Sequence, residues 1–145
     1  MTGGPQIVRI TGDLPDGFDD LLRSARAEGM GHLSRLADEW RGESSISAPG
    51  ECLLAALVGG ELAGIGGVTV EPALPQARRM RRFYVAPAMR RTGVGRTLAG
   101  ALMQEALAVT ETLTVHTERP DGQAFWLAMG FRPDLQNGWT HRYGA

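Results

Sequence analysis

The chain has 145 residues, of which 43% are hydrophobic and 21% charged, and its formal net charge at pH 7 is −1. We therefore expect one globular domain over residues 1–145, and the near-neutral charge argues against a nucleic-acid partner. A single cysteine, Cys52, excludes an intramolecular disulfide. The lack of a long apolar run or a signal-peptide pattern predicts a cytoplasmic protein without a membrane partner.

The first half of the chain alternates between apolar patterns and breaks rich in glycine and proline. Helical spacing of apolar residues and short β-type runs set the predicted order, and a Gly-Gly pair between two strands predicts a hairpin. The predicted elements are a strand at 7–11, helices at 19–28 and 33–40, and hairpin strands at 52–58 and 62–70.

Residues 78–85 form the next predicted strand, and four of its members are arginines. Successive side chains of a strand point to opposite faces. Regular alternation would place Arg79, Arg81, Phe83 and Val85 on one face and Arg78, Met80, Arg82 and Tyr84 on the other, unless a bulge shifts the register.

A loop rich in arginine and glycine follows this strand, and a helix begins at about Gly93. A helix start offers unpaired backbone N–H groups and the positive end of the helix dipole. Gly93 and Gly95 lack a Cβ, so an anion can approach the backbone closely. The loop therefore predicts a phosphate or pyrophosphate site. The predicted apolar stripe of the helix comprises Val94, Leu98, Ala101, Leu102 and Val109.

The last third of the chain continues the alternation of strand and helix. A strand is predicted at 113–117 and a short apolar helix at 121–129, with Asp121 as its N-cap. Gly130-Phe131 ends this helix and opens the last strands. Asn137-Gly138 predicts a turn before a final strand at 139–143.

Two well-known phosphate-binding patterns do not fit the loop at 90–96. The chain has no lysine, which a P-loop requires, and Leu98 stands where the dinucleotide fingerprint needs glycine. The remaining pattern is [Q/R]-x-x-G-x-[G/A], met by Arg90, Gly93 and Gly95. With Tyr84-Val85-x-Pro87 before it and Gly130-Phe131 after it, the chain resembles the GNAT (GCN5-related) N-acetyltransferases.

The resemblance implies an α+β fold in three layers. Its mixed, mostly antiparallel sheet has six or seven strands, is flanked by about four helices, and splays between parallel fourth and fifth strands. Acetyl-CoA is the implied co-substrate, with its pyrophosphate on the loop N–H groups and its pantetheine arm along the fourth strand. No metal-ligand spacing is present. The implied cofactor-binding residues are Phe83, Tyr84, Val85, Arg90, Arg91, Thr92, Gly93, Val94, Gly95, Arg96 and Trp126.

The catalytic residues depart from the family pattern. Relatives often carry a tyrosine four residues before the glycine of Gly-Phe as acid for the leaving thiolate, and here that residue is Trp126. An indole is no practical proton donor, so Trp126 either packs on the cofactor or is a core aromatic. The candidate catalytic residues are Tyr84 as acid, with Tyr143 as an alternative, and His116 or Glu71 as base. Both base candidates also have a purely structural interpretation, and His32 and His141 rank below them as bases.

The predicted function is direct transfer of an acetyl group from acetyl-CoA to a primary amine of a small molecule or peptide. The alternative is a catalytically weak, GNAT-like CoA-binding or regulatory module. The four arginines of the predicted strand at 78–85 have three interpretations. They are exposed to solvent, they face an acidic acceptor or the 3′-phosphate of the cofactor, or they contact RNA. In the family, the region 26–41 caps the acceptor site, so His32, Arg35, Glu39 and Trp40 are specificity candidates. The sequence leaves the oligomeric state open, and a homodimer is the candidate assembly because it is the commonest soluble oligomer.

Overall fold

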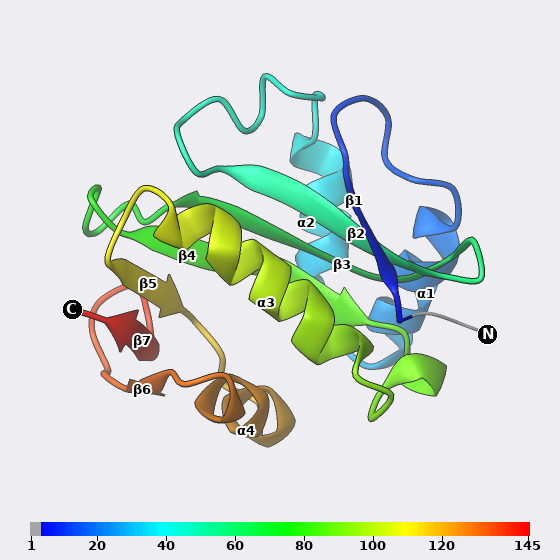
Figure 1. The fold of residues 1–145 in the computed structure, drawn as a ribbon. Helices are drawn as coiled ribbons and strands as arrows, with labels where there is room; N and C mark the ends of the chain where they lie inside the picture. Colours follow the sequence, from blue (N-terminus) through cyan, green and yellow to red (C-terminus); the bar gives the residue numbers. More distant parts are fainter. Residues whose placement is uncertain (1–3) are drawn as a thin grey trace.

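A computed structural model describes residues 4–145. Seven strands form one sheet in the order β1-β2-β3-β4-β5-β7-β6 (Figure 1). The strands are β1 (Gln6–Arg9), β2 (Cys52–Val58), β3 (Glu61–Val70), β4 (Arg78–Val85), β5 (Thr112–Val115), β6 (Arg132–Pro133) and β7 (His141–Gly144). The helices are α1 (Phe18–Ala27), α2 (His32–Glu39), α3 (Val94–Leu107) and α4 (Pro120–Ala128), with a 3₁₀ turn, η1 (Pro87–Met89).

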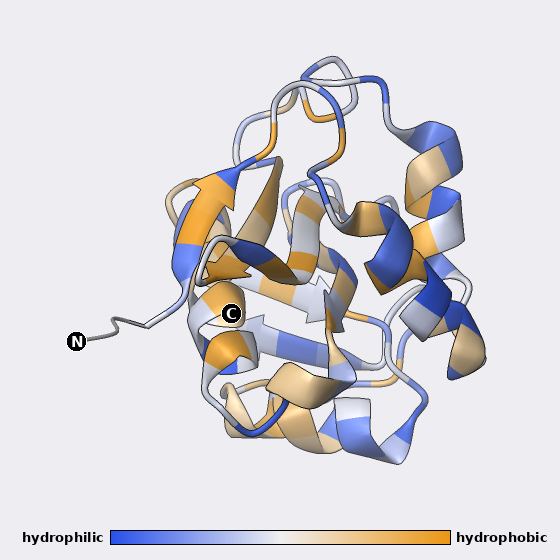
Figure 2. Ribbon diagram, turned by 90° about the vertical axis from the view of Figure 1, so that its right-hand side faces the viewer, coloured by the Kyte–Doolittle hydropathy of each residue, from blue (hydrophilic) through white to orange (hydrophobic). Residues whose placement is uncertain are grey.

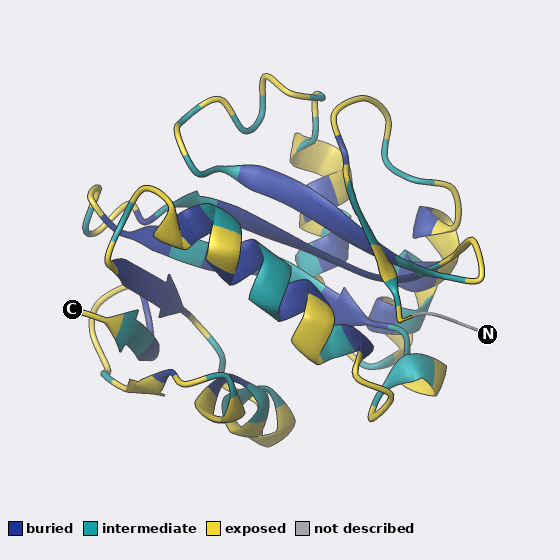
Figure 3. Ribbon diagram, viewed as in Figure 1, coloured by how far each residue is buried: buried dark blue, intermediate teal, exposed yellow. Residues whose placement is uncertain are grey.

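Helices cover both faces of the sheet and so produce three layers. Helix α3 packs across β2, β3, β4 and β5 on one face, and α1 and α2 lie on the other (Figure 1). Each face has its own core: Leu98 and Leu102 of α3 lie in one, and Leu21 and Leu33 of the helix pair lie in the other. The central strands are buried on both faces, whereas the loops are mostly exposed (Figure 3). Figure 2 shows hydrophobic stretches on the strands and alternating hydropathy along the helices.

The central strands separate beyond a short stretch of parallel pairing. Strands β4 and β5 pair only through Arg78–Leu113, Arg79–Thr114 and Met80–Val115. Beyond Met80, β4 continues to Val85, and no strand among residues 4–145 pairs with the edge that faced β5. The other pairs in the sheet are antiparallel. This arrangement confirms the mixed sheet, its seven strands, its flanking helices and the splay between parallel strands.

The side chains of β4 do not alternate as predicted, because the strand contains a bulge. The β3–β4 register shifts between Ile65 and Gly67, and Arg82 has φ 57°. Phe83 and Val85 pack in the α3-side core with Met80, whereas Tyr84 packs with the helix pair. An extra residue in one strand makes two consecutive side chains share a face. The regular alternation was therefore wrong beyond Met80.

Element boundaries differ from the predictions by a few residues in most cases. Val109 lies beyond the end of α3 and is 45% exposed, so it does not belong to the apolar stripe. His116 follows the last residue of β5. The N-cap of α4 is Arg119, and Asp121 lies within the first turn instead of capping it. Between residues 4 and 145, no helix combines the length and the apolar character needed to cross a membrane.

Candidate active site

The N-terminus of α3 presents a row of free backbone donors at the end of β4. The first helical hydrogen bond runs from Thr97 N to Gly93 O, at 3.0 Å. Within the described chain, no acceptor binds the backbone N–H groups of residues 93–96. Gly93 has φ 92° as the N-cap residue, a conformation that glycine adopts without the penalty of a Cβ. These N–H groups and the helix dipole together favour an anion here.

The three arginines around this turn have different surroundings. Arg91 and Arg96 are exposed, and neither forms an ion pair within residues 4–145. Arg90 points away from the free donors instead. Its Nη2 and Nη1 donate to the two carboxylate oxygens of Glu28, at 2.6 and 2.8 Å, and its Nε donates to Val85 O at 3.1 Å. Arg91 and Arg96 are therefore available to an anion, whereas Arg90 fastens the loop to the segment after α1.

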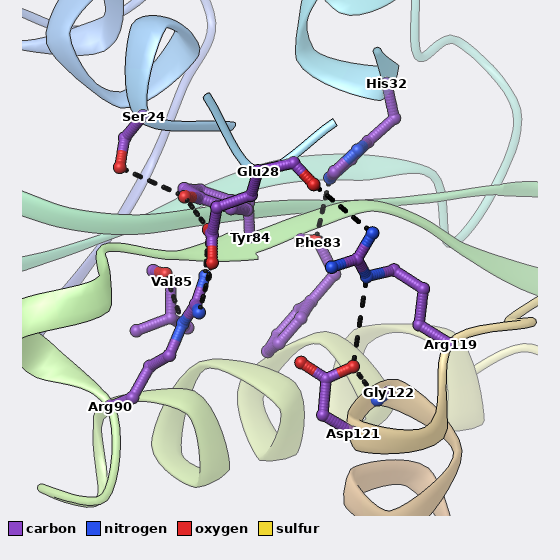
Figure 4. Close-up of polar contacts among 10 residues, drawn as sticks. All are labelled: Ser24, Glu28, His32, Phe83, Tyr84, Val85, Arg90, Arg119, Asp121 and Gly122. Carbon is purple, nitrogen blue, oxygen red and sulfur yellow. Dashed lines mark hydrogen bonds and ion pairs between the residues drawn. The ribbon is translucent and has the colours of Figure 1, made fainter. Parts of the chain in front are cut away.

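Glu28 is the centre of a polar network above the open part of β4 (Figure 4). Its carboxylate accepts hydrogen bonds from Arg90 and from the Tyr84 hydroxyl, which also lies 3.1 Å from Ser24 Oγ. Hydrogen bonds from Arg90 and then Tyr84 lower the pKa of Glu28 to about 2. Burial and the bond to Glu28 raise the pKa of Tyr84. Glu28 is therefore a fixed anion near neutral pH, and Tyr84 keeps its proton.

Two further side chains join separate segments near the open part of β4. Arg119, just before α4, donates from Nη1 to the backbone carbonyl of Glu28 at 3.3 Å, and its Nε lies 3.9 Å from Asp121 (Figure 4). His32, at the start of α2, has its Nε2 3.0 Å from Phe83 O. A carbonyl oxygen only accepts, so Nε2 carries the proton in the neutral ring and Nδ1 is left as an acceptor. Burial lowers the pKa of His32.

The predicted catalytic residues do not converge. His116 is exposed beyond β5, with Nε2 3.6 Å from the Glu118 carboxylate. Glu71 is 1% exposed and accepts from Thr114 Oγ1 at 2.9 Å and Ala73 N at 3.0 Å, so it is not the solvated turn residue that one interpretation expected. It lies beside the start of β4, and Tyr84 lies near the other end. About 20 Å of strand separates these positions, at about 3.3 Å per residue.

The aromatic residues of β4 and α4 form a packed cluster. Trp126 is 4% exposed, and its ring centroid lies 5.0 to 5.1 Å from those of Phe83, Phe125 and Phe131. This burial supports the core interpretation of Trp126. A Cβ on Gly95 would lie 3.3 Å from Phe125 Cε1, so this glycine allows α4 to pack closely against α3.

Comparison with known proteins identifies this arrangement. The sequence model of the acetyltransferase (GNAT) family matches residues 16–131. The chain belongs to this family of acetyltransferases. Among solved structures, it is similar to an acetyltransferase from Exiguobacterium sp. 255-15, with 26% identity and a TM-score of 0.86 over 98% of this chain and 94% of that one. No curated protein sequence matches it.

Two further relatives were solved with coenzyme A. The PaiA N-acetyltransferase of Thermoplasma acidophilum has 15% identity and a TM-score of 0.71, over 99% of this chain and 100% of that one. An aminoglycoside 6′-N-acetyltransferase has 17% identity and a TM-score of 0.68, over 94% of this chain and 92% of that one. At these identities the likeness concerns the fold.

Sequence reasoning missed Glu28 and Arg119, ranked His32 below His116 and Glu71 as a base, and otherwise named it only as a specificity candidate. In this acetyltransferase, Glu28 meets Arg90 across 62 residues of sequence, and Arg119 reaches Glu28 across 91. No local pattern marks such pairs. The signal that could have found Glu28 is its position just before Gly29, at the end of a helix expected to cap the acceptor site. Among the described residues, no group of three His, Cys, Asp or Glu side chains could hold a metal ion.

Proposed function

We propose that the protein transfers the acetyl group of acetyl-CoA directly to a primary amine within a ternary complex. One observation carries the proposal: the open edge of β4 leads directly to the free N–H groups at the start of α3. An extended amide-bearing chain can hydrogen-bond to such an edge, and a pyrophosphate can bind at such a helix start. Family membership supports the same ligand.

The residues of the loop would divide the cofactor contacts between them. The N–H groups of residues 93–96 would hold the pyrophosphate, with Arg91 and Arg96 supplying charge. Arg90 would keep the loop in place through Glu28 and Val85 O instead of binding phosphate itself. Phe83 and Val85 would contribute backbone groups along the pantetheine arm.

The chemistry requires proton transfers at both ends of the reaction. The amine nitrogen forms a bond to the thioester carbonyl carbon, the carbon–sulfur bond breaks, and the thiolate takes a proton. A base must remove the proton that the attacking amine carries. His32 fits this role better than His116, because its lowered pKa keeps the ring neutral near pH 7 and its Nδ1 can accept. Glu28, with a pKa of about 2, is too weak a base.

Two measurements test the proposal: the binding of acetyl-CoA, and the activity of variants that lack one or the other candidate base. Calorimetry should detect acetyl-CoA binding, and free thiol should appear when a panel of amines is added. His32→Gln should lower kcat by about 100-fold or more and remove an acidic limb of the pH profile, and His116→Gln is the matched control. If His116→Gln had these effects and His32→Gln did not, His116 would be the base. Binding of acetyl-CoA without thiol release from any amine would favour the regulatory module, which is motivated by the tryptophan at position 126 in place of tyrosine and by the lack of a carboxylate in β4.

A further inference from the structure

A hollow of about 200 Å³ lies beside the bulge of β4, on the face covered by α1 and α2. Leu36 and Trp40 line it from α2 and the residue after it, and Leu53 lines it from β2. Arg81 and Arg82 of β4 also line the hollow. The bulge explains why both arginines face the same way. A larger hollow of about 390 Å³ lies away from β4, around the start of α1.

The two arginines differ in their partners. The Arg82 guanidinium lies 2.7 Å from a carboxylate oxygen of Glu39, with its side chain 9% exposed. The Arg81 side chain is half-buried, and its guanidinium forms neither a hydrogen bond nor an ion pair with any residue from 4 to 145. Burial, then the charges of Arg82 and Arg79, lower the pKa of Arg81, and the charges of Glu39 and Glu71 only partly offset them. The guanidinium nitrogens are not among the fully buried unpaired atoms, so they can reach a molecule that enters the hollow.

A second polar group in the hollow also lacks a partner. Thr69 Oγ1 is buried and makes no hydrogen bond, and it is the one such side-chain atom found in the described part of the chain. Thr69 lines the hollow with Arg81. Buried polar atoms are usually paired, so the lining of this hollow contains two polar groups, the Thr69 hydroxyl and the Arg81 guanidinium, without a partner in the described chain.

We propose that the amine acceptor also carries a carboxylate, and that Arg81 binds this carboxylate in the hollow. The inference rests on the transferase function proposed above. A guanidinium pairs with a carboxylate through two parallel hydrogen bonds. The apolar side chains of Leu36, Leu53 and Trp40 would contact a hydrocarbon part of the acceptor.

The position of the hollow sets the size of this acceptor. Two residues of strand separate Arg81 from Phe83, whose carbonyl accepts from His32. This corresponds to at most about 7 Å at about 3.3 Å per residue, because the stretch includes Arg82, whose φ of 57° departs from an extended strand. An amine near His32 and a carboxylate at Arg81 therefore fit a molecule of amino-acid or short-peptide size.

The first experiment compares each acceptor carboxylate with its uncharged carboxamide. The common amino acids and a set of dipeptides are each assayed against their C-terminal carboxamides, by thiol release from acetyl-CoA and mass spectrometry of the product. We expect kcat/KM to be about 10- to 100-fold higher for the carboxylates of the preferred acceptors. Equal or better turnover of the carboxamides throughout the panel would overturn the inference and leave the transferase function intact. A phosphate acceptor such as phosphoethanolamine, preferred over every carboxylate, would overturn the carboxylate assignment.

The second experiment removes the charge. Arg81→Gln should abolish the preference for the carboxylate mainly through KM, and Arg81→Lys should restore part of it. Arg23→Gln is the control, because Arg23 lies on α1 with a side chain 70% exposed and its loss changes the net charge equally. An unchanged preference in Arg81→Gln would refute the role of Arg81.

Equilibrium binding keeps the inference testable if no amine is turned over. N-acetyl amino acids and N-acetyl dipeptides, which mimic the products, are titrated calorimetrically into the protein with CoA present, alongside their carboxamides. Tighter binding of the carboxylates, lost in Arg81→Gln, would support the anion site even for a protein without catalysis. Absence of any such difference would overturn the anion site, whatever the outcome of the thiol assay.

Discussion

Replacing Glu28 tests the network that fastens the loop of residues 90–93 to the segment after α1. Glu28→Gln keeps the shape and one acceptor oxygen but removes the charge that Arg90 and Tyr84 stabilise. The pKa of Glu28 falls from 4.5 to about 2 on folding. At about 1.4 kcal/mol per unit, this corresponds to at most about 3.5 kcal/mol. The Glu28 side chain is 28% exposed, and solvent screening reduces the expected loss to about 1–2 kcal/mol.

The pH dependence of this loss is a sharper test than its size. A carboxylate whose pKa is depressed on folding stabilises the protein above its unfolded pKa, and this stabilisation disappears as pH falls through the folded value. The difference in unfolding free energy between wild type and Glu28→Gln should therefore be constant above about pH 5. It should shrink mostly between pH 4.5 and about 2. Urea unfolding at several pH values measures it.

The control is an exposed ion pair of the same chemistry. Asp20 lies 2.7 Å from Arg23 on α1, with side chains 83% and 70% exposed. Asp20→Asn should change the unfolding free energy by less than about 0.5 kcal/mol. If Glu28→Gln proved as mild as Asp20→Asn at pH 7, or if its effect persisted unchanged to pH 2, the reasoning on the Glu28 network would be refuted.

Three further predictions concern single residues of the loop and the cores. Gly93→Ala should lower the free energy of unfolding by about 1 kcal/mol, because alanine is strained at the φ of 92° found here. It should also raise the Kd for CoA in calorimetry, because relieving this strain moves the free N–H groups. Burial raises the pKa of Cys52 to about 12, so iodoacetamide at pH 8 should modify it only after unfolding; rapid labelling of the native protein would contradict this. Trp126→Ala should cost about 3–5 kcal/mol in urea unfolding, and a smaller loss with weaker CoA binding would favour a cofactor contact over a core role.

The sequence predicts the elements of this fold well where their signals are local. Strands β2 and β4 begin and end at the predicted residues, because Gly, Pro and polar residues bound both runs. Boundaries were less accurate at helix ends. Val109 continues the helical spacing of α3, but the helix ends at Leu107. The spacing of apolar residues therefore does not predict the residue at which a helix ends and the chain leaves the sheet.

The site was less predictable than the fold because its contacts join distant segments. The free N–H groups near Gly93 follow from a local motif. The burial of Glu71 depends on a bond to Thr114 of β5, and the partner of Arg90 comes from the end of α1. Neither contact leaves a periodic trace in the sequence. The chemistry of a charged residue in this chain is therefore decided by tertiary packing.

The bulge of β4 links these observations to the proposed acceptor site. Gly66 lies at the register shift and is not paired with a residue of β4. A Cβ on Gly66 would lie 2.7 Å from Leu102 Cδ1 of α3. Glycine therefore allows α3 to approach the sheet at the bulge. On the opposite face, the same shift places Arg82 beside Arg81, and the next residue, Phe83, returns to the α3 side. With regular alternation Arg82 would face the α3 core, where a guanidinium has no partner. The bulge thus resolves a conflict between charge and burial, and it leaves Arg81 as the unpaired cation of the hollow.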